Sequence, residues 1–224
     1  MLKQIVIALV FGAVAAAQTS SRPERKVEGN VITSERDPSV HIRLPTSAQY
    51  VGADRWVLYG IADCELHAFV DADEHKSVRR LYWVQFEGYL PIKPNLKYTY
   101  DSPRHSTIGG MDFYVDTWVR ASAPETKPDS DGAHVRALIH AKGYTSPAGM
   151  MYVRLVHLLD EQKRKELMII YGEDLASTGF SAADLAKGGK AYDQWPAVEK
   201  GLIERAISRL ALEQPSPRPS GAEL

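Results

Sequence analysis

The densest group of side chains that could do chemistry is Asp63-x-Glu65-x-His67. Alternate spacing along an extended strand places all three on one side, about 6.6 Å from one to the next. Two carboxylates and an imidazole could transfer protons or ligate a metal, but ligands at about 2 Å would require a further residue from elsewhere in the fold. No H-E-x-x-H spacing and no paired cysteines support a metal. We therefore predict no metal site and interpret the triplet as a polar strand with satisfied groups.

Other strand-like segments combine aromatic rings with charged side chains on one face. Period-two alternation makes the opposite face of each segment apolar. The candidate ligand-binding residues on the mixed faces are Glu87, Asp112, Tyr114, Asp116, Trp118 and Arg154. Aromatic walls with a few converging polar groups are typical of a ligand pocket. A solvated face of an antiparallel sheet shows the same alternation, and the sequence leaves both interpretations open.

Motifs of enzymes are weak in this chain, so its catalytic residues remain unknown and no cofactor is predicted. There is no G-x-S-x-G nucleophile motif. The Gly109-Gly110 pair precedes a strand rather than a helix, which favours a tight turn over a phosphate site. An alternative function is an enzyme that uses carboxylates, with acid–base candidates Asp112, Asp116, Glu65 and Glu87. It would require two of them to converge with shifted pKa values.

The first twenty residues predict export. Lys3 is followed by an apolar run over residues 5–17 that ends in Ala15-Ala16-Ala17, which is typical of a signal peptide. The run is shorter than the ~20 residues that span a bilayer, and no second apolar stretch is long enough. We therefore expect cleavage after Ala17, a periplasmic or extracellular location, and no transmembrane anchor in the mature chain.

Composition restricts the partners and the redox chemistry. The 224 residues include 27 basic and 28 acidic side chains, for a net charge of −1, which gives no electrostatic reason to expect nucleic acid. The single cysteine, Cys64, cannot form an internal disulfide, and its phase with Ala62 and Leu66 predicts burial. We expect an exported cell-envelope protein that binds a small molecule or an envelope protein. A structural subunit of an envelope assembly is a further alternative.

The hydrophobic pattern predicts the elements that carry these residues. Expected strands cover residues 40–44, 55–61, 62–70, 80–90, 111–120, 150–158 and 166–171. Expected helices cover 133–142, a short turn beginning at the capping box of Ser181, and an amphipathic segment from Pro196.

Short connections between neighbouring strands favour an α+β fold with a mainly antiparallel sheet of about five to seven strands. The amphipathic C-terminal helix and the middle helix would pack on it. We expect a signal peptide at 1–17, a flexible linker at 18–37, a single domain at 38–212 and a disordered tail at 213–224.

Overall fold

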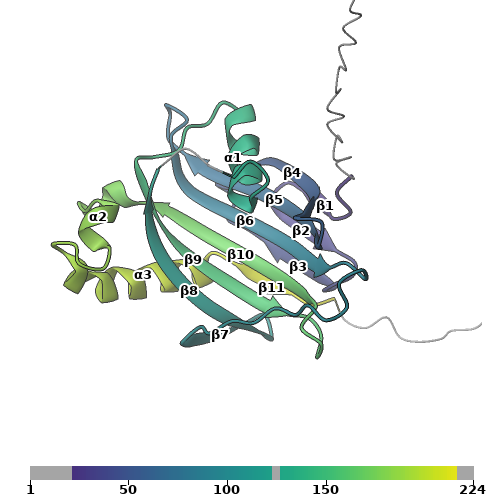
Figure 1. The fold of residues 1–224 in the computed structure, drawn as a ribbon. Helices are drawn as coiled ribbons and strands as arrows, with labels where there is room; N and C mark the ends of the chain where they lie inside the picture. The colour runs from purple at the N-terminus through teal and green to yellow at the C-terminus, as the bar shows by residue number, and fades with distance from the viewer. Residues whose placement is uncertain (1–21, 123–126, 216–224) are drawn as a thin grey trace, which may run out of the picture.

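The computed structural model describes residues 22–122 and 127–215 and has an α+β fold with two antiparallel sheets (Figure 1). The large sheet has the strand order β4-β5-β6-β10-β9-β8-β7, and the small sheet has the order β1-β2-β3-β11. The strands of the large sheet are β4 (Gln49–Leu58), β5 (Ala62–Ala72), β6 (Val78–Tyr89), β7 (Arg104–Ile108), β8 (Met111–Ala121), β9 (Gly149–Leu158) and β10 (Lys165–Asp174). The strands of the small sheet are β1 (Lys26–Glu28), β2 (Val31–Ser34), β3 (Val40–Arg43) and β11 (Ala211–Glu213). The predicted fold class is confirmed.

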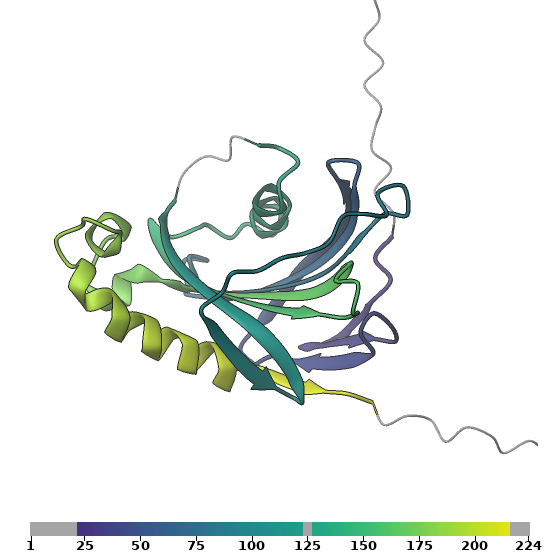
Figure 2. The same cartoon turned by 60° about the horizontal axis from the view of Figure 1, so that its bottom comes forward.

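The helices lie on opposite faces of the large sheet (Figure 2). They are α1 (Asp131–Ala141), α2 (Ala182–Leu185) and α3 (Trp195–Ser208), with 3-10 turns η1 (Leu175–Thr178) and η2 (Tyr192–Gln194). The side chain of Ser130 accepts a hydrogen bond from the Ala133 amide and starts α1. Pro196 lies in the first turn of α3, as the sequence predicts. The middle and C-terminal helices are confirmed, and the sheet separates them.

Strand alternation divides the buried side chains into two cores. The first core fills the space between the large sheet, the small sheet and α3, and it includes Ile42, Phe69 and Leu202. The second core lies between the large sheet and α1, and it includes Trp83 and Ile139. The fully buried Cys64 belongs to the second core, which confirms its predicted burial.

The flexible linker predicted at 18–37 is wrong for residues 26–34, which form β1 and β2. Ile32 of β2 is fully buried in the first core, and β2 pairs with both β1 and β3. The strands are too short for a periodic signal, and their stability comes from this pairing. Similarly, β11 places Glu213 in a strand beside β3, although the disordered tail was predicted to begin there. The predicted signal peptide at 1–17 lies outside the described residues.

The predicted tight turn at Gly109-Gly110 joins β7 to β8. Both glycines have positive φ, +59° and +78°, a conformation that side-chain-bearing residues rarely adopt. A Cβ on Gly109 would also lie 2.2 Å from the carbonyl oxygen of Leu212. The turn therefore requires glycine for its backbone conformation and for its close approach to β11.

Candidate functional site

Cross-strand register arranges the α1-side face of the large sheet in rows that run across the strands. One row, which we name the carboxyl row, contains Glu87, Glu166 and Leu158. The middle row contains Trp83, Ile170, Arg154 and Asp116. The aromatic row contains Leu81, Gly172, Tyr152 and Trp118. The last row contains Asp174, Met150 and Arg120. Acidic and basic side chains are thus spread along this face: Glu87 and Glu166 lie at one end, Asp116 and Arg154 are neighbours in the middle row, and Asp174 shares the last row with Arg120.

The helix α1 covers part of this face: it packs against β4 and β5, whereas on β8 Arg120 is exposed and Asp116 and Trp118 are half-buried. Val135 and Ile139 of α1 join the second core, and Trp83 is only 8% exposed. His134 anchors the same helix: its ring stacks on Trp56 at a centroid distance of 4.0 Å, and its Nδ1 lies 2.7 Å from Asp54 Oδ2. The face is therefore covered on its β4–β5 side and partly open to solvent along β8.

Four of the six predicted binding residues lie together. Trp118 and Arg154 line a cavity between α1 and the sheet. Arg154 Nη2 donates to Asp116 at 2.7 Å, and its guanidinium lies 5.0 Å from the ring centroid of Tyr100. The ring of Tyr114 contacts Tyr100 at a centroid distance of 5.7 Å. Asp116 and Tyr100 therefore orient Arg154, and Tyr114 packs against Tyr100.

The other two predicted residues, Glu87 and Asp112, lie apart from this group of four. Glu87 accepts hydrogen bonds from Gln85 Nε2 and from the Tyr98 hydroxyl, each at 2.8 Å. Asp112 is exposed near the β7–β8 turn, where it accepts from the Thr107 hydroxyl at 2.6 Å. Period two assigned Asp112 to the correct face, but its position near the end of β8 keeps it away from the cleft.

The cavity has a volume of about 380 Å³, within the usual range for small-molecule sites. It adjoins a smaller cavity of about 110 Å³ beneath α1. Residues shared by the two linings are Trp83, Trp118, Arg120, Gly132 and Ile170. We call the two cavities together the α1 cleft.

Asp131, at the start of α1, brings a carboxyl group to the larger cavity. Its Oδ1 is buried and has no hydrogen-bond partner among the described residues. Burial, followed by the charge of Glu87, raises the pKa of Asp131 to about 6. The group is therefore close to half-ionised in mildly acidic solution and can accept a hydrogen bond from a ligand.

A buried carboxyl pair lies next to the cleft. Glu87 and Glu166 are directly opposite each other on β6 and β10, a position in which like charges repel. Burial, followed by the charge of Glu87, raises the pKa of Glu166 to about 8, so Glu166 is protonated at neutral pH. The Tyr100 hydroxyl donates to Glu166 at 2.7 Å, and Glu166 is only 3% exposed. Neither carboxyl lines the larger cavity.

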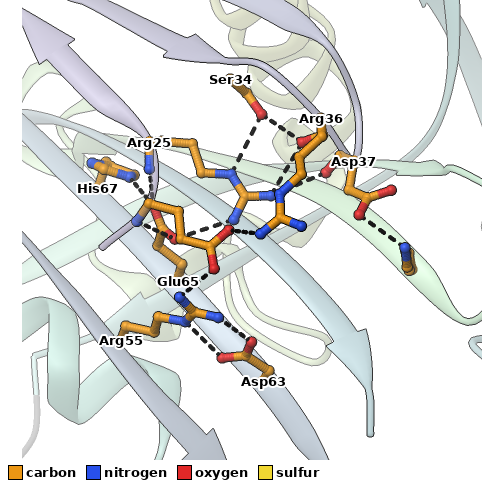
Figure 3. Close-up of polar contacts among 10 residues, drawn as sticks. Arg25, Ser34, Arg36, Asp37, Arg55, Asp63, Glu65 and His67 are labelled. Atoms are coloured by element: carbon orange, nitrogen blue, oxygen red, sulfur yellow. Dashed lines mark hydrogen bonds and ion pairs between the residues drawn. The ribbon is translucent and has the colours of Figure 1, made fainter. Parts of the chain in front are cut away.

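Glu65 and His67 lie on the opposite face of the large sheet, away from the α1 cleft. Glu65 and Glu87 both line a separate pocket, next to Arg25 and Lys165. Glu65 accepts from the backbone amides of Glu24 and Arg25 at 2.9 and 2.8 Å, and its Oε1 lies 2.9 Å from His67 Nε2 (Figure 3). Burial alone would raise the pKa of Glu65, but the hydrogen bonds from His67 and the two amides outweigh it and lower the pKa to about 2. Glu65 thus fastens the segment before β1 to the large sheet.

Asp63, the remaining member of the triplet, belongs to an ion-pair network at the surface. Arg55 donates to both Asp63 oxygens, at 3.0 and 2.6 Å, and to Glu24 at 2.7 Å (Figure 3). Each member of Asp63-x-Glu65-x-His67 therefore has a partner within the protein. Across residues 22–122 and 127–215, no group of three or more His, Cys, Asp or Glu side chains is arranged to hold a metal ion.

The predicted site residues did not include Asp131 and Arg120, which line the cleft, or Glu166, which lies next to it. Period-two alternation could have identified Arg120 and Glu166. Arg120 lies on the same face of β8 as Trp118, and Glu166 lies beside Glu87 of the neighbouring strand. Asp131 precedes the helix predicted at 133–142, and nothing in its sequence neighbourhood indicates that it meets β6. That proximity comes from the packing of α1.

Comparison with known proteins found no matching family model, no similar curated protein and no similar solved structure. Within the part of the chain that the structure describes, no helix is both long and apolar enough to cross a membrane.

Proposed function

We propose that this protein binds a small ligand in the α1 cleft. The observation that carries the proposal is the cavity of about 380 Å³ lined by Trp83 and Trp118, with the buried, unpartnered Oδ1 of Asp131 at its wall. A buried acceptor without a partner costs about 1–3 kcal/mol. A ligand with a donor group would remove that cost, and the indole rings would bury its apolar part.

The test is a small-molecule screen read by thermal shift and by tryptophan fluorescence. A ligand of this site should raise the melting temperature and change the emission of Trp118. Trp118→Ala should abolish binding while the variant keeps a cooperative melt. Trp195→Ala is the matched control, because Trp195 lies on α3 across the sheet. Equal binding by both variants would exclude the α1 cleft.

A second candidate function is acid–base catalysis, favoured by the Glu87–Glu166 pair. A protonated carboxyl beside a second carboxyl group is an arrangement that enzymes use for proton transfer. Binding is better supported, because Glu166 is buried and neither carboxyl lines the larger cavity. If the protein turns over a substrate, Glu166→Gln should remove that activity. Full activity in this variant would eliminate the pair as the catalytic group.

We further propose that the protein acts outside the cytoplasm as a cell-envelope protein. The support is the charged start, apolar run and small residues of segment 1–17. Expression of the full chain, cell fractionation and N-terminal sequencing would test it. A mature protein that begins at Gln18 and leaves the cytoplasm is expected, and an uncleaved cytoplasmic chain would contradict the proposal.

A further inference from the structure

The smaller cavity of the α1 cleft is an apolar chamber. Its walls come from the inner face of α1 and from β6, β8, β9 and β10. The apolar and aromatic side chains that line it include Leu81, Trp83, Trp118, Val135, Ile139, Met150, Tyr152 and Ile170. Such a lining favours a hydrocarbon or aromatic group over water.

Gly172 makes room for the aromatic side of this chamber. A Cβ on Gly172 would lie 3.0 Å from a ring carbon of Tyr152, so the tyrosine ring lies close over the strand at that position. The same ring stacks against Trp118, with centroids 5.1 Å apart and an interplanar angle of 18°. The two rings therefore form a preformed, flat wall for an apolar group.

The charged lining residues of this chamber are all basic. Arg120 and Arg136 line it, and no Asp or Glu is among its described lining residues. Burial raises the pKa of the Tyr152 hydroxyl, and the positive charges of Arg120 and Arg136 partly offset that rise. Of the acids near this face, Glu87 and Glu166 lie in the carboxyl row, away from Arg120 along the strands. Asp174 shares the last row with Arg120 but is paired with Arg79, and Asp131 lines the larger cavity rather than this chamber.

We propose that the α1 cleft takes an amphipathic organic anion, with its apolar part in the chamber beneath α1 and its anionic group at Arg120, which lines both cavities of the cleft. This inference rests on the proposed ligand-binding function and names its ligand class. The guanidinium of Arg120 matches a carboxylate, sulfonate or phosphate. The shape of the chamber and the burial it provides select the apolar part of the ligand. The positive charge of Arg120 selects a ligand with a negative charge.

The charge selectivity can be tested with three probes that share one alkyl chain: octanoate, octan-1-ol and octylammonium. Binding to the mature protein is measured by calorimetry and by tryptophan fluorescence at pH 7. Octanoate should bind about tenfold more tightly than octan-1-ol, and octylammonium should bind most weakly. Added salt should weaken octanoate binding and leave octan-1-ol binding unchanged.

Variants separate the ligand class from the site itself. Arg120→Gln should weaken octanoate binding about fivefold or more and leave octan-1-ol binding unchanged. Arg43→Gln is the control, because Arg43 is exposed on β3 in the small sheet. Trp118→Ala should weaken both probes.

Each contrary outcome has a distinct meaning. Equal affinity for octanoate and octan-1-ol, tighter binding of octylammonium, or no effect of Arg120→Gln would overturn the anion class and leave the site standing. Octanoate binding that is unaffected by Trp118→Ala would overturn the proposed site. Failure of all three probes to bind would refute this inference, while the wider ligand screen still decides whether the cleft binds another class.

Discussion

Replacing Glu166 by Gln should stabilise this protein in neutral and alkaline solution. Glu166 is buried opposite Glu87, and its pKa rises from the ordinary 4.5 to about 8. The folded state therefore keeps a proton that the unfolded chain releases. A glutamine has nearly the same shape, its amide oxygen can still accept from the Tyr100 hydroxyl, and it has no proton to lose.

The magnitude follows from proton linkage. Below pH 4.5, Glu166 is protonated in both states and costs nothing. Between pH 4.5 and 8 only the unfolded chain ionises, so stability falls by about 1.4 kcal/mol per pH unit. The accumulated loss is about 3 kcal/mol at pH 7 and about 5 kcal/mol above pH 8, and Glu166→Gln should recover most of it.

Urea unfolding of both proteins at pH 4.5, 7 and 8.5, followed by tryptophan fluorescence, measures this difference. The variant should match the native protein at pH 4.5 and exceed it by a few kcal/mol at pH 8.5. A difference that is independent of pH, or a variant that is less stable at pH 8.5, would refute the reasoning.

Glu173, at the other end of β10 and on the opposite face, provides a control of opposite sign. Burial would raise its pKa, but hydrogen bonds from Arg205 and Tyr171 outweigh burial and lower it. The ionised form of Glu173 therefore stabilises the fold above its ordinary pKa, and that contribution is lost as pH falls. Glu173→Gln should destabilise the protein at pH 7 and have a smaller effect in acid.

The remaining predictions concern the anchoring of the chain around the large sheet. Glu65→Gln should lower the free energy of unfolding at pH 7 by about 3 kcal/mol, because the folded-state pKa of about 2 makes the ionised form stabilising; urea unfolding should show the effect fading as pH falls below 4.5. Arg164 donates to carbonyl oxygens of segment 89–96, so Arg164→Ala should speed amide hydrogen exchange there, and unchanged protection would argue against that role. Gly109→Ala should lower the melting temperature more than Gly110→Ala, because only the former places a Cβ 2.2 Å from a carbonyl oxygen of β11.

The sequence alone predicted most strands of the large sheet and, within a strand, which side chains share a face; β1, β2, β7 and β11 were not predicted. Period two correctly assigned Tyr114, Asp116 and Trp118 to one side of β8 and Phe113 to the other. The alternation is strong because each face of the large sheet packs against a different core. The long amphipathic α3 was equally predictable, because its apolar stripe repeats over several turns.

The tertiary structure decided which face of the large sheet packs against which core, and which residues from different strands and helices come into contact. Alternation within β5 and β6 could not reveal that Glu65 faces the first core while Glu87 faces α1, because strand phase depends on register. The strands β1 and β2 are too short to stand without pairing, so their sequence carried no signal. The pairing of Glu87 with Glu166, the contact of Asp131 with the cleft, and the arginines beside the chamber all join residues far apart in the chain. Such contacts arise from strand pairing and helix packing, and a local pattern cannot specify them.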